Sequence, residues 1–127
     1  MTPDRARGGL RFAGYAAVFD AVDRGGDVVR KGAFAGAGKV PLLWQHGGTP
    51  VGAIEAIEED SRGLRVIGRV DDARVRVAPG SGLSFGYRVR ESRAGRVREL
   101  TALELVEVSL VARPMQPLAR VHAVDDF

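Results

Sequence analysis

Three polar side chains, each in a separate apolar run of the sequence, are of the types that acyl-transfer chemistry needs: His46, Ser84 and Glu107. An imidazole has an unperturbed pKa of about 6.5, so it can take up and release a proton near neutral pH. A serine hydroxyl attacks a carbonyl carbon when a neighbouring base removes its proton, and a carboxylate can fix the tautomer of that base. If the fold brings these residues together, they could form a catalytic triad.

Each of the three also has a structural interpretation. His46 ends the run VPLLWQH before two glycines, where a half-buried histidine could simply bind a carbonyl. Ser84 shares one strand face with Gly82 and Gly86, which clears space for a carbonyl but is also typical of a bulge or packing site. Glu107 interrupts the apolar run LELVEVSLV, and it could pair with an arginine at the rim because an unpaired buried carboxylate is costly. The residue types leave both interpretations open.

The composition is that of one small globular domain. The chain has 127 residues, 45% of them hydrophobic, which is enough for a single core. Cysteine is absent, which excludes disulfides and thiolate chemistry. No apolar run approaches a membrane span of about 18 residues, and the N-terminus lacks the pattern of a signal peptide. We expect one cytoplasmic domain over 1–127, with its core at about 10–119 and flexible tails at 1–9 and 120–127.

The formal net charge of +3 comes almost entirely from arginine. Lys31 and Lys39 are the only lysines among the 19 basic residues. Most arginines alternate with apolar residues, as in RVRV and YRVRESR, a pattern typical of the solvated face of a strand. The alternative is an anion-binding patch or a small basic barrel that binds nucleic acid. Such a surface is normally denser in charge and richer in aromatic residues, so we do not expect nucleic acid as the partner.

Short runs of alternating hydrophobicity, separated by glycine and aspartate, indicate a mainly β fold. The predicted strands are 10–19, 40–46, 51–59, 63–70, 83–92 and 97–111. The third and fourth form a hairpin around DSRG, whose Asp60 and Gly63 suit the outer positions of a type I turn. The last run is either two strands or one bent strand. Residues 20–27 are expected to form a loop, and 31–38 at most one turn of helix. This many short strands suggests a closed or nearly closed β-barrel.

The chain resembles the prohead (head-maturation) proteases of tailed bacteriophages in five stretches: GYAAVFDAVDRGGDVVRKGAF, VPLLWQH, PVGAIEAIEEDSRGLRV, GLSFGYRV and LELVEVSLVARPMQPLA. The resemblance extends from about Arg11 to Ala119. Its most specific parts are the histidine of LLWQH, the serine of LSFGY and the block EVSLV followed by proline, in the order of the family. These proteases are serine peptidases related in fold to the herpesvirus assembly proteases. The resemblance therefore implies a β-barrel with a few short helices.

The resemblance also implies a function. It predicts a serine endopeptidase that cleaves the scaffolding region from the major capsid protein, and in many cases itself, during prohead maturation. By this resemblance the nucleophile is Ser84, the base is His46 and the third member is Glu107, while Arg113 assists the oxyanion site. No cofactor or metal is implied. The expected partners are the capsid protein and a second copy of the chain, inside the assembling prohead in the bacterial cytoplasm.

One segment departs from the family. Before the serine strand the family carries a longer stretch with a helix, whereas here residues 71–82 are short, with ARVRV predicted as a strand and APGSG as a turn. The alternative function is therefore a catalytically impaired assembly module that binds capsid or scaffold protein. Asp20, Asp23 and Asp27 are expected to form Asx turns rather than a metal site. His122 is assigned to the C-terminal tail, outside the site.

Overall fold

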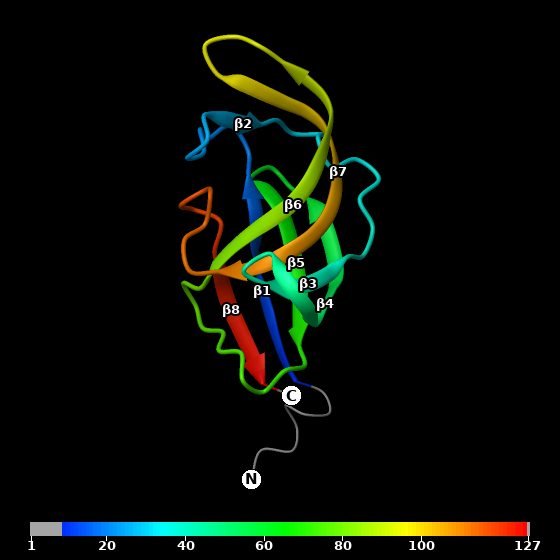
Figure 1. Cartoon of the computed structure of the whole chain (residues 1–127), viewed down its shortest axis with the longest axis vertical. Helices are drawn as coiled ribbons and strands as arrows, with labels where there is room; N and C mark the ends of the chain where they lie inside the picture. Colours follow the sequence, from blue (N-terminus) through cyan, green and yellow to red (C-terminus); the bar gives the residue numbers. More distant parts are fainter. Residues whose placement is uncertain (1–8, 127) are drawn as a thin grey trace.

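The computed structural model describes residues 9–126, which form one eight-stranded sheet (Figure 1). The strands are β1 (Leu10–Val18), β2 (Asp27–Val29), β3 (Pro41–Trp44), β4 (Gly47–Glu59), β5 (Gly63–Val70), β6 (Gly82–Arg93), β7 (Arg98–Val111) and β8 (Val121–Asp126). All six of these predicted strands agree to within a few residues with observed strands, namely β1, β3, β4, β5, β6 and β7. The run at 97–111 is one bent strand, because bulges interrupt its pairing with β6.

The strand order is β2-β7-β3-β4-β5-β1-β8, with β6 paired to β7. Strands β6 and β7 form a long hairpin that crosses in front of the others and extends beyond them (Figure 1). The sheet curls but is not closed by a strand pair. Its two ends approach each other at an isolated bridge between Gly82 and Arg120, and Leu83 N–H donates to Ala119 O across the same junction at 2.9 Å. The expected barrel is therefore an open, strongly curled sheet.

Alternation of apolar side chains builds the core on the concave side of this sheet. In β5 the residues Leu64, Val66 and Val70 are fully buried, while the alternate residues Arg65, Ile67 and Arg69 are only partly buried. Leu42 of β3 and Leu83 of β6 belong to the same hydrophobic cluster. Because the strands that carry the predicted site residues pack through this cluster, the core fixes the relative positions of β3, β6 and β7.

Three expectations about local structure are wrong. Residues 9–126 contain no helix, so the short helices implied by the family resemblance are absent there, and 31–36 form only turns. The stretch 73–77, predicted as a strand, is irregular although its residues alternate, because no neighbouring strand pairs with it. The tail expected at 120–127 is mostly strand β8, which pairs with β1. Apart from Gly9, the tail expected at 1–9 lies outside the described residues.

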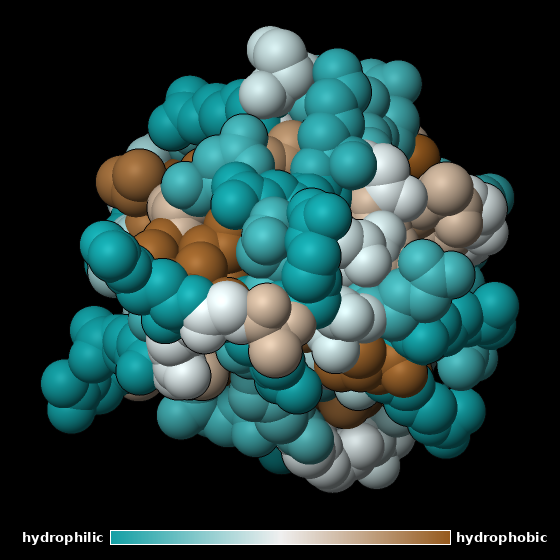
Figure 2. All heavy atoms as spheres, turned by 90° about the horizontal axis from the view of Figure 1, so that it is seen from above, coloured by the Kyte–Doolittle hydropathy of each residue, from teal (hydrophilic) through white to brown (hydrophobic). Residues whose placement is uncertain are grey.

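The surface seen from above is mainly hydrophilic, with hydrophobic atoms in small separate patches (Figure 2). The chain's many arginines contribute to this, and several pair with carboxylates, as Arg98 does with Asp27 through two contacts of 2.9 and 2.8 Å. Within residues 9–126 no helix has the length and hydrophobicity needed to cross a bilayer.

Candidate active site

His46 lies in the two-residue turn between β3 and β4. Trp44 pairs with Gly47, which leaves Gln45 and His46 between the strands. Both have positive φ, 52° and 61°, which is the pattern of a type I′ turn, a geometry that usually takes Asn-Gly or Asp-Gly. The left-handed conformation costs a non-glycine residue about 1–2 kcal/mol. The strand predicted at 40–46 therefore ends two residues too late, because β3 ends at Trp44.

The end of β7 holds this turn in its strained conformation. Gln45 N–H donates to Leu110 O at 2.9 Å, and Gln45 Oε1 accepts from Ala112 N–H at 2.8 Å. His46 N–H donates to Ser109 Oγ at 3.1 Å. These three hydrogen bonds compensate for the backbone strain, because strained residues persist only where their surroundings over-determine them. They also fix the imidazole against β7.

The imidazole of His46 meets the carboxylate of Glu107. Nδ1 lies 2.6 Å from Oε1, and Ser109 Oγ donates to the other oxygen, Oε2, at 2.7 Å. Glu107 is only 7% exposed, so its charge depends on these partners. A carboxylate that accepts from Nδ1–H leaves the lone pair of the ring on Nε2, which is the tautomer that a general base needs. Since the His46 side chain is 43% exposed, a substrate can reach it.

Ser84 occupies the neighbouring strand β6, on the same face of the sheet. In the antiparallel pairing of β6 with β7, Ser84 lies opposite Ser109, and Gly86 lies opposite Glu107. Paired residues and alternate residues point to the same side of a sheet. Ser84 therefore lies two residues along the sheet from the position opposite Glu107, with its side chain on the same face as the carboxylate. Ser84 is largely buried. The pairing thus brings Ser84 near the Glu107 carboxylate that His46 contacts.

Gly86 makes the space in which the Glu107 carboxylate sits. A Cβ at position 86 would lie 2.4 Å from Glu107 Oε1 and 2.9 Å from its Cδ. Oε1 is the oxygen that contacts His46. Any side chain at position 86 would therefore push the carboxylate out of its place beside the imidazole. The need for glycine here is steric, because the backbone of Gly86 does not have a positive φ.

Two parts of a complete acyl-transfer site are not assembled. Within the described residues no hydrogen bond joins the Ser84 hydroxyl to His46, although such bonds are often long in a free enzyme and tighten with substrate. Arg113, predicted near the oxyanion site, follows β7 in an irregular segment, and its side chain is exposed. No hydrogen bond or ion pair joins Arg113 to residues 9–126.

The remaining candidates lie away from this site. Asp23 forms the expected Asx turn, accepting from Gly25 N–H at 2.8 Å and from Asp27 N–H at 3.0 Å. Asp27 instead pairs with Arg98, which lowers the pKa of its carboxyl through hydrogen bonding, and Asp20 pairs with Arg30. In the described part of the chain no three His, Cys, Asp or Glu residues gather as metal ligands. His122 lies in β8, with its ring 5.9 Å from that of Tyr15.

Sequence reasoning missed the contributions of Ser109 and Gly86. Ser109 is fully buried and contacts both the Glu107 carboxylate and the backbone of His46. Its position two residues after Glu107 on a predicted strand already placed it on the same face, but a serine in an apolar strand has no pattern that indicates a partner. Gln45 was also missed, because a Gln-His pair is not a recognised turn signal.

Comparison with known proteins identifies the family of this fold and site. Residues 1–126 match the family model described as caudovirus prohead serine protease. The chain belongs to this prohead protease family. The prohead protease of Enterobacteria phage HK97 is 30% identical over 135 aligned residues, which cover 89% of this chain and 59% of that protein. The chain thus spans less than two thirds of the length of this relative.

Two solved structures share the fold of this prohead protease family member. A crystal structure of KSHV protease in complex with a hexapeptide phosphonate inhibitor superposes with a TM-score of 0.65 at 15% identity, covering 93% of this chain and 65% of that one. A second structure of KSHV protease gives a TM-score of 0.53 at 18% identity, with 94% and 62% covered. The expected relationship to the herpesvirus assembly proteases is confirmed at the level of the fold.

Proposed function

We propose that this chain is a serine endopeptidase of prohead maturation, with Ser84 as nucleophile, His46 as general base and Glu107 as the residue that orients His46. The observation that carries the proposal is the 2.6 Å contact between His46 Nδ1 and the buried Glu107 carboxylate. Glu107 lies on β7, the strand that pairs directly with the strand of Ser84, in a chain of this family. The proposed substrate is the major capsid protein with its scaffolding region, and the place of action is the prohead assembling in the bacterial cytoplasm.

The residues would carry out acyl transfer in two stages. Ser84 Oγ attacks the carbonyl carbon of the peptide bond while His46 Nε2 takes the hydroxyl proton. His46 then gives this proton to the leaving amine, the C–N bond breaks, and an ester to Ser84 remains. Water hydrolyses this ester with His46 again as the base. Glu107 stays ionised throughout and stabilises the imidazolium, while Ser109 positions Glu107 through its hydrogen bond.

Stabilisation of the oxyanion is assigned to backbone N–H groups near Ser84, with Arg113 as an additional donor. Arg113 directly follows the strand that carries Glu107, and its guanidinium has no partner within residues 9–126, so it is available to a developing negative charge. Loss of one oxyanion donor typically costs about 2.7–4 kcal/mol of transition-state stabilisation. Replacement of Arg113 by Ala should then lower kcat with little change in KM.

Co-expression with the cognate capsid protein tests the function. The wild-type chain should produce a shortened capsid protein, seen by mass spectrometry, and the Ser84→Ala variant should leave it intact. Unchanged cleavage with the variant would contradict the proposal.

A second candidate function is a non-catalytic assembly module that binds capsid or scaffold protein. The absence of a Ser84–His46 hydrogen bond in the described residues favours it. This module predicts that wild-type and Ser84→Ala chains bind the capsid protein equally and that neither cleaves it. The expected homodimer stays a prediction, which sedimentation of the purified chain would test.

A further inference from the structure

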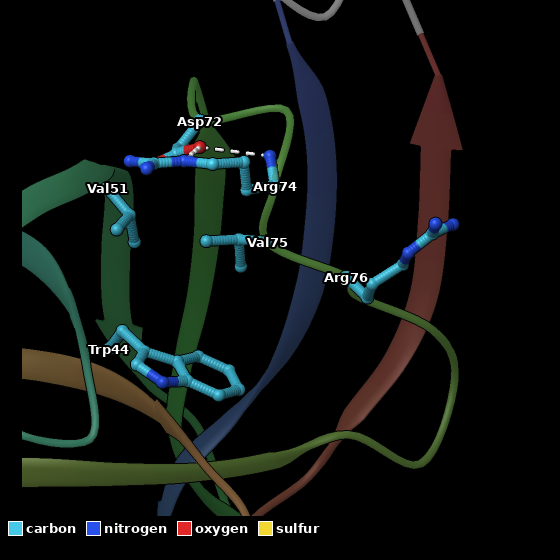
Figure 3. A pocket seen from close by; sticks show the side chains of 6 residues that line it. All are labelled: Trp44, Val51, Asp72, Arg74, Val75 and Arg76. Carbon is cyan, nitrogen blue, oxygen red and sulfur yellow. Dashed lines mark hydrogen bonds and ion pairs between the residues drawn. The ribbon is translucent and has the colours of Figure 1, made fainter.

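A hollow beside the candidate site has no part in the proposed chemistry. It has a volume of about 530 Å³ and is lined by Trp44, Val51, Asp72, Arg74, Val75 and Arg76. Figure 3 shows the indole of Trp44 and the side chains of Val51 and Val75 facing a common space, with the Asp72–Arg74 ion pair on the side opposite the indole. The Trp44 side of the hollow is apolar, and the opposite side is charged.

A second hollow, of about 260 Å³, adjoins this one and reaches the strand of Ser84. The two hollows share Trp44 and Arg76, and the second also reaches Gly82 of β6 and Ala112 after β7. Gly82 is two residues from Ser84, a distance of about 7 Å along a strand. On the other side, Trp44 directly precedes the turn that carries His46. We call the two hollows together the Trp44 pocket.

The rim of the Trp44 pocket is positively charged. Arg74 pairs with Asp72 at 2.8 Å, but within residues 9–126 neither Arg76 nor Arg120 has an ion pair with a carboxylate. Arg120 donates to the carbonyl oxygens of Pro117 and Gly80, which leaves its charge in place. The planar guanidinium of arginine can donate two parallel hydrogen bonds to a carboxylate, and at exposed positions such as these the contact adds a modest affinity. The rim therefore suits an acidic ligand.

We infer that the Trp44 pocket binds an apolar side chain of the polypeptide substrate, in a segment that also carries acidic residues. The inference rests on the proposed function, and it adds a substrate class. The half-exposed indole and the two valines would cover the apolar side chain, while Arg76 and Arg120 would bind the flanking carboxylates. One extended residue spans at most about 3.6 Å, so a segment held here lies only a few residues from the bond at Ser84.

Peptide binding to the Ser84→Ala variant tests this inference without cleavage. Trp44 is the only tryptophan of the chain, so its fluorescence reports directly on the pocket. Three peptides are compared: one with Leu between Glu residues, one with Ser in place of Leu, and one with Gln in place of Glu. The first should change the fluorescence and bind at least about fivefold more tightly than the other two, because each control loses one class of contact. Equal binding of all three would overturn the inference.

Charge reversal at one rim position adds a matched comparison. Arg76→Glu should weaken binding of the acidic peptide at least about threefold, and less so at high salt, because screening removes the difference. Arg96→Glu makes the same change at an exposed arginine in the β6–β7 turn, at the opposite end of the molecule (Figure 1), and should leave binding unchanged. Equal effects of the two substitutions would contradict the inference.

The two proposals fail in different ways. If the peptides do not discriminate while Ser84→Ala still abolishes capsid cleavage, the pocket assignment is wrong and the peptidase remains. If the Ser84→Ala chain still cleaves, the peptidase proposal is wrong whatever the fluorescence shows.

Discussion

The turn before β4 and the turn after it close hairpins on the same sheet by different means. The turn at 60–63 is built from its own residues: Asp60 Oδ1 accepts from Arg62 N–H at 2.8 Å and from Gly63 N–H at 3.0 Å, and no residue in it has a positive φ. The turn at Gln45 and His46 has two non-glycine residues in the left-handed region. It is held by hydrogen bonds to β7, a strand more than 60 residues away.

The difference shows where this fold accepts local strain. A turn that only reverses the chain uses residues whose intrinsic preferences fit it, as Asp60 and Gly63 do. The residues of the turn with His46 do not have that local preference, and their conformation places the imidazole against a buried carboxylate. Strained backbone is typical of functional sites. We therefore expect substitutions around the Gln45–His46 turn to affect catalysis. Substitutions around the second turn, at 60–63, should affect only stability.

The largest effect should come from Glu107→Gln. An amide that donates to Nδ1 would select the tautomer with its proton on Nε2, and that ring cannot accept the serine proton. We expect kcat to fall by about 10³- to 10⁴-fold, as for loss of the orienting carboxylate in other triads. Steady-state cleavage of a capsid-derived peptide measures this, with circular dichroism to show that the variant is folded. A kcat within tenfold of wild type would remove Glu107 from the mechanism.

Ser109→Ala should have a smaller effect on catalysis, because it acts through Glu107. It removes the donor to Oε2 and the acceptor of His46 N–H, and a lost hydrogen bond to a buried charged group costs about 1.5–3 kcal/mol. We expect kcat to fall by about one to two orders of magnitude, with a shift of the lower limb of the pH–rate profile. A purely structural role would lower the free energy of unfolding and leave that profile in place.

Gly86→Ala tests whether the carboxylate needs the space opposite it. The new methyl group would displace Glu107 Oε1, so we expect a loss of activity together with a loss of about 1–3 kcal/mol in the free energy of unfolding. Gly95→Ala, in the exposed β6–β7 turn, is a matched control, since a Cβ there meets nothing closer than 3.5 Å. Equal activity of the two variants would mean that the carboxylate is not confined by Gly86.

The smallest effect on catalysis should come from Asp60→Ala in the second turn. It should lower the free energy of unfolding by about 1–2 kcal/mol through lost hydrogen bonds, with kcat unchanged. The hydrogen bond from Tyr15 lowers the pKa of the Asp60 carboxyl. The contribution of ionised Asp60 to the free energy of unfolding is therefore complete above the unfolded pKa of about 3.9. It is lost as the pH falls through the lower pKa of the folded protein. Denaturation with urea at several pH values measures both quantities, and a fall in kcat would break the contrast between the turns.

Much of the fold could be predicted because it follows from local alternation. The strands around Leu64 and Leu83 have clear period-two patterns, and the hairpin around Asp60 has an ordinary turn sequence. The short strand β2 and the strand β8 were missed, since their pairing depends on β7 and β1 rather than on their own sequence. The irregular stretch 73–77 shows the converse, where alternation without a neighbouring strand does not make a strand.

The site could be predicted only in part. His46, Ser84 and Glu107 were selected by residue type and by family resemblance, and the pairing of β6 with β7 places two of them on adjacent strands. The hydrogen bond from His46 N–H to Ser109 depends on the pairing of β3 with β7, more than 60 residues apart in the chain. The steric role of Gly86 depends on the register of β6 against β7. A single sequence contains no direct record of that register.

Labelling with a fluorophosphonate probe shows whether His46 activates Ser84, because the probe reacts only with a serine that a neighbouring base activates. If these residues form a triad, one labelled site is expected, mapped by mass spectrometry to Ser84 in the wild-type chain, and no labelling at Ser84 in the His46→Ala variant. Labelling of Ser84 at the same rate in both proteins, or no labelling of a wild-type chain that cleaves the capsid protein, would contradict the proposed triad.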